Sequence, residues 1–314
     1  YLDDHVDGAD RADAWLGLAF SRWRLDDQDG ALAAVNGLRK EGTDATRRAE
    51  ALYIEGRVGL ESGDREGAAR ALTAYLENHG DGPRVADVLR ELARVAEDRG
   101  DSERAIELLE RRLADHPRAT ASDEALYRVA WLRLSEGDEA KAAKGFSSLV
   151  SQHPKSEFAG DAHFRLGEIA YAADDHKAAR AAFTAAISCG TGKAAGSEGT
   201  SSPEGSLIAE RARYRLGWSY RKGEEWARAA EVFETLVREN PTGDLAGEAL
   251  YLAADAADRG ERPLDASRLL ERFLDEYPKH ERSSAAKIRL AETLADKEEW
   301  ARIRTLLDPL RTTQ

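Results

Sequence analysis

The chain has 314 residues, of which 42% are hydrophobic and 33% are charged, and its formal net charge is −13. This composition is that of a folded protein, and the acidic charge excludes general nucleic-acid binding because contacts to phosphates need a basic surface. No run approaches the roughly 18 apolar residues of a membrane-spanning helix. The chain has no Met and begins at Tyr1, so we expect it to be a piece of a longer protein.

Small residues recur along the chain every 37 residues. The pentapeptide EEWAR occurs at 224–228 and, two such steps later, at 298–302. A period of this length predicts an array of structural repeats rather than two globular domains. In chain order the small residues are Ala19, Gly56, Ala93, Ala130 and Gly167, then, after a longer step of 50, Gly217, Ala254 and Ala291.

Each repeat is predicted to contain two helices. The first has apolar residues at helical spacing, as at Leu126, Val129 and Leu134. A Gly-Asp pair ends it in several repeats, because Gly adopts the left-handed conformation and Asp caps the next helix. These pairs stand at 63–64, 100–101 and 137–138. The second helix carries, at one fixed position, a column of mostly small residues: Ala31, Ala68, Ala105, Ala142, Ala179, Ala229, Ala266 and Ile303. Four residues later it carries a column of bulky residues: Val35, Leu72, Leu109, Phe146, Phe183, Phe233, Leu270 and Leu307. A proline follows the second helix in several repeats: Pro117, Pro154, Pro241 and Pro278.

Three histidines, His79, His116 and His153, share the 37-residue spacing. On successive repeats they would lie too far apart to bind one metal ion. We expect each to lie at a helix C-terminus, where His interacts favourably with free carbonyls. No other group of residues has the pattern of a catalytic or metal site. The sequence therefore predicts no enzyme activity, no metal and no cofactor.

The order of small residue, turn, small residue, bulky residue and proline resembles the tetratricopeptide repeat, lengthened here to 37 residues. The resemblance covers essentially the whole chain in eight units. It implies an all-α, right-handed superhelical solenoid. Linkers such as HPKSEFAGDAHFRLGE are similar to those of bacterial envelope proteins, namely the periplasmic tetratricopeptide protein of the Tol–Pal system and the lipoprotein of the outer-membrane barrel-assembly machinery. They favour the periplasm or the outer membrane, although the residues themselves identify no compartment.

The 13 residues that interrupt the period fall in the segment 190–206, GTGKAAGSEGTSSPEGS. Its Gly and Ser content and its lack of apolar periodicity predict a flexible insertion. The predicted organisation is one continuous solenoid with units one to five in 1–189, the insertion in 190–206, and units six to eight in 207–314.

By the geometry of the family, the first helix of each unit lines a concave groove. Aromatic and Arg side chains dominate binding hot spots, so those on the fourth to sixth units are the predicted contacts for a protein or peptide. The same aromatic stripe can instead pack between neighbouring helices as core. Trp226 and Trp300, in the two EEWAR copies, are better placed for a core role. The predicted binding residues are Tyr127, Trp131, Phe164, Tyr171, Tyr214, Trp218, Arg221 and Lys222.

The predicted function is that of a non-catalytic scaffold in a bacterial envelope complex, which binds a protein or peptide in this groove. Two alternatives stay open. In the first, the chain is a helical, non-catalytic arm of a larger envelope enzyme. In the second, it is a structural array that associates with itself. The sequence that flanks this chain in its gene would separate a scaffold from an enzyme arm.

Overall fold

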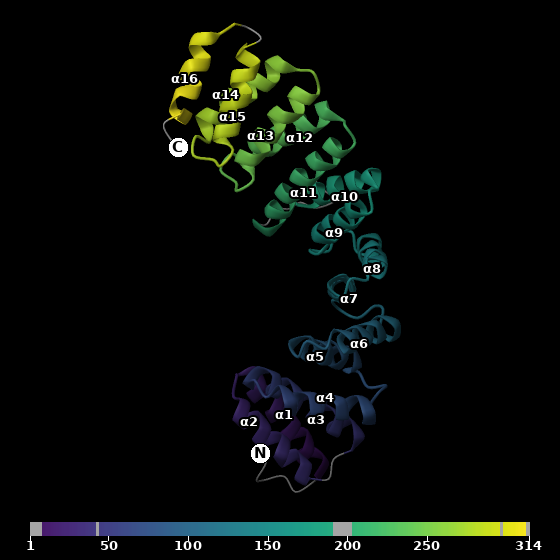
Figure 1. Ribbon diagram of the computed structural model, residues 1–314. Coiled ribbons are helices and arrows are strands. Elements are labelled where there is room, and N and C mark those ends of the chain that lie inside the picture. Colours follow the sequence, from purple (N-terminus) through teal and green to yellow (C-terminus); the bar gives the residue numbers. More distant parts are fainter. Residues whose placement is uncertain (1–7, 42–43, 191–202, 296–297, 312–314) are drawn as a thin grey trace. The chain divides into compact units, whose positions relative to one another are not determined.

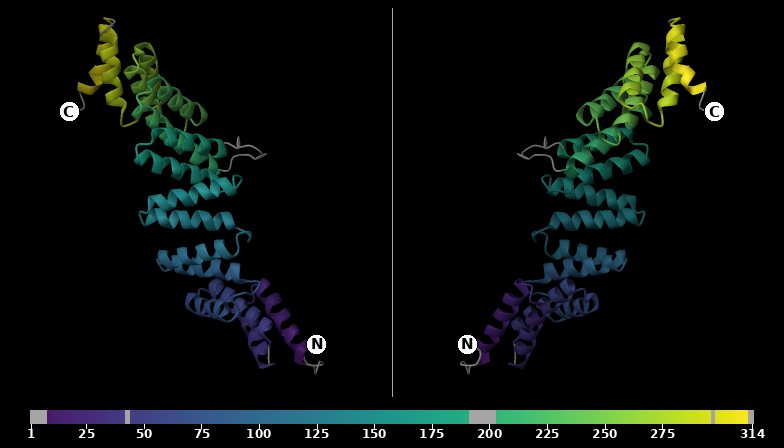
Figure 2. Two further views of the ribbon diagram at one scale, coloured as in Figure 1. Left: turned by 90° about the vertical axis from the view of Figure 1, so that its right-hand side faces the viewer. Right: turned by 90° about the vertical axis from the view of Figure 1, so that its left-hand side faces the viewer.

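The computed structural model describes residues 8–41, 44–190, 203–295 and 298–311. These residues form sixteen α-helices and no strand, which confirms the all-α prediction; the exact period and the handedness of the array stay predictions. Within residues 1–137, and again within residues 138–314, consecutive helices lie side by side (Figures 1 and 2). They are α1 (Gly8–Arg24), α2 (Gln28–Lys40), α3 (Ala45–Ser62), α4 (Arg65–Asn78), α5 (Val85–Asp98), α6 (Ser102–Asp115), α7 (Ser122–Ser135), α8 (Glu139–Gln152), α9 (Ala159–Ala172), α10 (His176–Gly190), α11 (Pro203–Lys222), α12 (Trp226–Glu239), α13 (Ala246–Arg259), α14 (Pro263–Glu276), α15 (Ser283–Ala295) and α16 (Trp300–Arg311).

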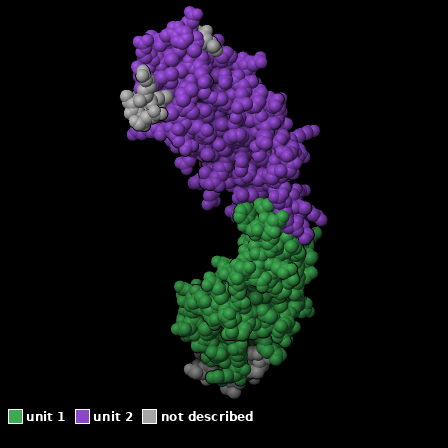
Figure 3. All heavy atoms as spheres, viewed as in Figure 1, with its two compact units in different colours: residues 1–137 green, residues 138–314 purple. Residues whose placement is uncertain are grey.

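The chain divides into two compact units, residues 1–137 and 138–314 (Figure 3). The first unit holds α1 to α7 and the second holds α8 to α16. The boundary falls in the turn between α7 and α8, and therefore inside the fourth predicted repeat. Most of the predicted insertion, residues 191–202, lies outside the described residues. The grouping of the repeats into 1–189 and 207–314 stays a prediction.

The turns inside the helix pairs are built as the sequence predicted. Gly63, Gly100 and Gly137 have φ values of 84°, 75° and 82°, a region that Gly enters without a Cβ clash. The Asp after each of these glycines accepts a hydrogen bond from the backbone N–H three residues on, at 2.8 to 3.1 Å. The equivalent turns of other repeats place a larger residue at positive φ: Asp26, Asp174, Glu224, Glu261 and Glu298.

The small and bulky columns form the core of the helix pairs. From Gly56 to Ala291 every residue of the first small column is buried, and so is every bulky residue from Val35 to Leu270. The two columns meet directly. A Cβ on Gly167 would come within 2.5 Å of the Phe183 ring. The small residue is therefore required for the bulky residue of the same pair to pack.

The ends of the helices test two further predictions. His79, His116 and His153 are the C-cap residues of α4, α6 and α8, and each backbone N–H donates to the carbonyl four residues earlier, which confirms their expected place. Trp300, however, is 62% exposed at the start of α16, so the prediction that it is buried in the core is wrong. Its counterpart Trp226 is half-buried because Gly260, in the turn of the next pair, lies against it. No described helix follows α16 to cover Trp300 in the same way.

Candidate functional site

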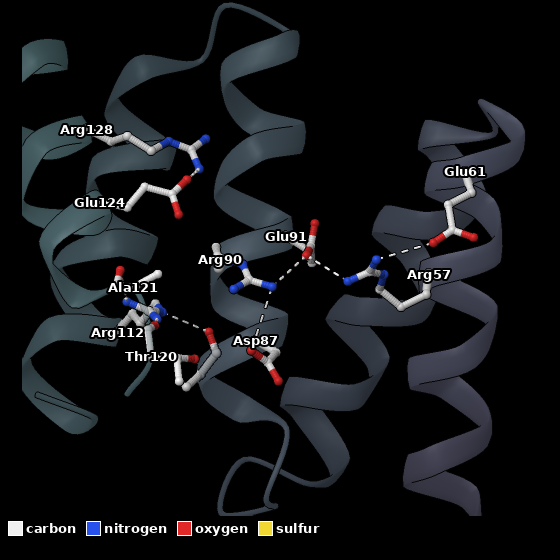
Figure 4. Close-up of polar contacts among 11 residues, drawn as sticks. Arg57, Glu61, Asp87, Arg90, Glu91, Arg112, Thr120, Ala121, Glu124 and Arg128 are labelled. Carbon is white, nitrogen blue, oxygen red and sulfur yellow. Dashed lines mark hydrogen bonds and ion pairs between the residues drawn. The ribbon is translucent and has the colours of Figure 1, made fainter. Parts of the chain in front are cut away.

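In the first unit, charged side chains on successive first helices form a network (Figure 4). Glu91 of α5, whose side chain is 7% exposed, accepts hydrogen bonds from Arg57 of α3 and from Arg90, both at 3.1 Å. Arg57 also pairs with Glu61 at 3.2 Å, and its guanidinium lies 5.3 Å from the centre of the Trp23 ring. Each arginine here is matched by a nearby carboxylate. This face is therefore held rigid but has little excess charge with which to attract an ion.

The same view contains a fully buried arginine, Arg112 of α6 (Figure 4). Its Nε donates to the carbonyl of Ala86 at 3.1 Å, its Nη1 to that of Ala121 at 3.3 Å, and its Nη2 to that of Thr120. Burial, helped by the charge of Arg90, lowers the pKa of the Arg112 guanidinium. Because its acceptors are backbone carbonyls of α5 and of the linker to α7, Arg112 fixes that linker and is not available to a ligand.

Tyr127 and Trp131 are the predicted binding residues that lie in the first unit. They stand one turn apart on α7, and their rings are stacked, with centres 6.5 Å apart and planes 11° from parallel. Trp131 is 40% exposed, whereas most large apolar side chains of the chain are buried. The pair presents a flat aromatic surface to solvent.

The other six predicted residues lie on α9 and α11 in the second unit. Phe164 is 8% exposed and packs against Phe183, with ring centres 5.8 Å apart. It belongs to the core, which leaves it little surface for a partner. Tyr171 is half-buried, with its ring 5.7 Å from that of His176. Of these two residues, only Tyr171 keeps an accessible edge.

The α11 residues form a compact group. Tyr214 packs edge-on against Trp218, with ring centres 6.3 Å apart, and against Phe233 at 6.0 Å. The guanidinium of Arg221 lies over the Trp218 ring, 4.4 Å from its centre. Lys222 is exposed beside it. The structure thus brings Tyr214, Trp218 and Arg221 together in direct contact.

Arg221 is more constrained than the sequence suggested. Its side chain is only 14% exposed and donates to Asp255 of α13 at 2.5 Å. Asp255, 6% exposed, also accepts from Arg259 at 3.1 Å and from Arg289 of α15 at 2.5 Å. Burial acts to raise the pKa of Asp255, but the three guanidinium groups outweigh it and lower the pKa. Asp255 is therefore the anchor of a three-arginine cluster, which we call the Asp255 cluster.

Sequence reasoning did not assign binding roles to Asp255, Arg259 or Arg289. The signal for the first was present, because Asp255 interrupts a run of buried alanines in α13, and a buried carboxylate needs charged or hydrogen-bonding partners. Two of those partners, Arg221 and Arg289, each lie 34 residues away in the sequence. No local pattern identifies partners at that separation.

In the described part of the chain, no three His, Cys, Asp or Glu side chains are grouped so that they could hold a metal ion. None of the described helices combines the length and apolar character that crossing a bilayer requires. A cavity of about 480 Å³ opens between α10, α11 and α12, and none of the predicted binding residues lines it.

Two family models match parts of the chain. Residues 45–185 match a family described as outer membrane lipoprotein, and residues 214–281 match a tetratricopeptide repeat model. No curated protein sequence matches the chain.

Several solved structures are similar to this chain at low sequence identity. A structure of Naa15/Naa10 bound to HypK-THB aligns with 96% of this chain and 41% of that one, at a TM-score of 0.59 and 14% identity. A tetratricopeptide repeat protein from Parabacteroides merdae covers 90% of this chain and 98% of its own, at 0.47 and 15% identity. YrrB, described as a TPR protein with an unusual peptide-binding site, covers 70% of this chain and 99% of its own, at a TM-score of 0.49 and 18% identity.

Proposed function

This chain is a tetratricopeptide-repeat protein, and we propose that it is a non-catalytic scaffold that binds a protein or peptide partner through its first-helix faces, in a complex of the bacterial envelope. The repeat fold is typical of protein-interaction scaffolds, and the outer membrane lipoprotein match over residues 45–185 supports the envelope. The observation that carries the proposal is the exposure of rigid aromatic surface on the first helices. The two compact units each contribute such a face, and each face is tested separately.

In the first unit the face is the stacked pair Tyr127 and Trp131. Trp131 is 40% exposed, and a partner that covers its ring would remove a large apolar area from water. The two rings hold each other in place, so little side-chain entropy is lost when a partner covers them.

In the second unit the face is made by Tyr171, Tyr214, Trp218, Arg221 and Lys222. Arg221, which is held by Asp255, fixes the half-buried Trp218 ring, and this ring offers an apolar edge near the exposed amine of Lys222. Arginine and tryptophan are the residue types most enriched in binding hot spots. Phe164 contributes by supporting α9 from the core rather than by contact.

A library of short random peptides, selected on the immobilised full chain, provides ligands for the test. Dissociation constants are measured by fluorescence anisotropy for the wild type, Trp131→Ala, Trp218→Ala and the control Trp300→Ala, which removes an exposed tryptophan outside the proposed faces. If a tryptophan is a central contact, its loss weakens binding by about 2 kcal/mol, or roughly thirtyfold. The control is expected to bind like the wild type.

Thermal melting of every variant separates binding from packing, since loss of a core tryptophan destabilises a protein by about 3–5 kcal/mol. Early melting of both Trp131→Ala and Trp218→Ala would assign the aromatic residues to the core. Stable variants that bind the selected peptides at full strength would place the site elsewhere and refute the proposal. Selection of no binding peptide at all would do the same.

A further inference from the structure

We propose that the second unit binds a small uncharged molecule, with an apolar body and an oxygen acceptor, in the cavity between α10, α11 and α12. The cavity has a volume of about 480 Å³, within the range of about 300–1,000 Å³ that is typical of small-molecule sites. Arg213, Leu216 and Tyr220 line it from one side of α11, since they are spaced by three and four positions. Trp218 of the proposed partner face lies about 200° around the helix from Leu216. The cavity is therefore a separate site for a different class of ligand.

The cavity has apolar walls where Leu216 lies between Arg213 and Tyr220. Leu216 belongs to a buried core cluster, and Ile187 of α10 and Val232 of α12 pack against that cluster while remaining half-buried. All three side chains line the cavity. Water beside such walls makes few hydrogen bonds, so an apolar group that displaces it lowers the free energy. This part of the cavity is the place for the apolar body of the ligand.

The Tyr220 end of the cavity is fixed by side chains from all three helices. The guanidinium groups of Arg180 of α10 and Arg228 of α12 lie 5.1 and 5.8 Å from the centre of the Tyr220 ring. Both arginines also pair with Glu225, at 2.6 and 2.7 Å. These contacts connect α10, α11 and α12 in the absence of a ligand. Because the cavity is already formed, binding loses little conformational entropy.

Arg213 supplies hydrogen-bond donors at the other end. The residue is 9% exposed, and its Nη2 pairs with Glu239 at 2.5 Å. The other guanidinium nitrogens of Arg213 have no acceptor in the described part of the chain. Burial lowers the pKa of the Arg213 guanidinium, although Glu239 acts to raise it. A buried guanidinium needs acceptors for its remaining donors, and an oxygen atom of a ligand in the cavity would supply one.

The charged groups around the cavity favour an uncharged ligand. The basic groups on or next to its lining are Arg180, Arg213, Arg228 and Arg238, and the acidic groups are Glu210, Glu225, Glu231, Glu234 and Glu239. Of the five carboxylates, that of Glu210 accepts from Asn240 and lines a smaller neighbouring cavity. The remaining charges balance, so an anion or a cation would lose its hydration without meeting a net counter-charge.

Three related fluorescent molecules serve as probes. Prodan is an uncharged naphthalene that carries a ketone oxygen. The second probe is the same molecule without the ketone group, and the third is the anion anilinonaphthalene sulfonate. Each is titrated into the full chain as wild type, Val232→Trp, Arg213→Met and the control Thr184→Trp. Val232→Trp places an indole in the cavity, whereas Thr184 is exposed on α10 and does not line it.

Prodan is expected to bind the wild type about tenfold more tightly than the probe without the ketone, because a hydrogen bond to a charged group is gained. It is also expected to bind at least as tightly as the anion. Arg213→Met abolishes the preference for the ketone, and Val232→Trp abolishes the binding of both uncharged probes. The control Thr184→Trp binds them like the wild type.

The inference is overturned if Prodan does not bind, if the anion binds more tightly, or if the wild type shows no preference for the ketone. It is also overturned if the preference survives Arg213→Met, or if Prodan binds unchanged to a Val232→Trp variant that melts like the wild type. If Val232→Trp melts early, Thr235→Trp, at another half-buried lining position, replaces it. Peptide binding at Trp131 and Trp218 is measured separately, because neither residue lines the cavity.

Discussion

At the residue scale, the turns of the helix pairs show how different residue types adopt one backbone conformation, that of positive φ. Eight equivalent turns place a residue at positive φ, and only three of them use Gly. An L-residue in the left-handed region brings its Cβ close to a carbonyl, which costs about 1 kcal/mol. Asp26 and Asp174 tolerate this conformation better than the three glutamates do, because short polar side chains can hydrogen-bond locally.

The turns therefore offer a pair of opposite substitutions. Glu261→Gly is expected to raise the free energy of unfolding by up to about 1 kcal/mol, since Glu261 is exposed and strained at φ 56°. Gly100→Ala is expected to lower it by a similar amount, because nothing lies within 4 Å of the new Cβ and only the backbone is affected. Urea unfolding measures both. A destabilised Glu261→Gly variant would show that the glutamate makes an interaction worth more than the strain.

At the element scale, a recurring ion pair joins a first helix to the residue that immediately precedes the next first helix. Glu50 pairs with Arg84 at 3.3 Å, and Glu248 pairs with Arg282 at 2.9 Å. The partners of each pair stand 34 residues apart, which is the length of one repeat minus about one helical turn. Asp255 lies at the same separation from Arg221 and from Arg289. Exposed pairs contribute about 0–1 kcal/mol each. The buried Asp255 cluster is expected to contribute more.

Asp255→Asn tests that cluster through pH. The pKa of Asp255 is lowered in the folded state, so the carboxylate stabilises the fold above its unfolded pKa of about 3.9, and this stabilisation is lost as the pH falls through the folded value. At neutral pH the variant is expected to be less stable by about 3–5 kcal/mol, because three arginines then lack a counter-charge. The difference in stability should begin to shrink as the pH falls below about 4 and should disappear only below the folded-state pKa of Asp255, which lies lower still. Urea unfolding across this pH range measures the difference, with Asp275→Asn, at an exposed position of α14, as the control. A gap that is independent of pH would mean that packing, not charge, is responsible.

At the scale of the whole molecule, the chain consists of two compact units, which hold α1 to α7 and α8 to α16. In repeat proteins each element contacts mainly its sequence neighbours, so stability is local and a perturbation remains near its origin. A substitution in one unit is therefore expected to leave the other unit protected. The buried arginine of the first unit provides the probe.

Arg112→Met removes a buried guanidinium that donates to three backbone carbonyls. The carbonyl of Ala121 keeps the N–H of Ala125 as a donor, but the loss of the other bonds is expected to destabilise the surrounding helices by about 1–3 kcal/mol. Hydrogen exchange followed by mass spectrometry should show faster exchange in α5 to α7 and unchanged exchange in α11 to α15. The control is the neighbouring Arg111→Met, which removes only an exposed pair with Asp115 and is expected to change stability by less than about 0.5 kcal/mol. Faster exchange throughout both units would contradict the local model and indicate one cooperative structure.

The sequence by itself determined the elements of this protein: the helix pairs, the glycine turns with their aspartate caps, and the small and bulky columns that meet as Gly167 and Phe183 do. These features follow from local conformational preferences and a fixed period, so they can be predicted without knowing which residues from elsewhere in the chain pack nearby. Only the tertiary structure decided which side chains are accessible. Phe164 is buried and Trp300 exposed because of which helices cover them, and Arg221 is held by an aspartate 34 residues away. Burial and ion pairing depend on contacts between repeats, and a residue's own repeat does not contain that information.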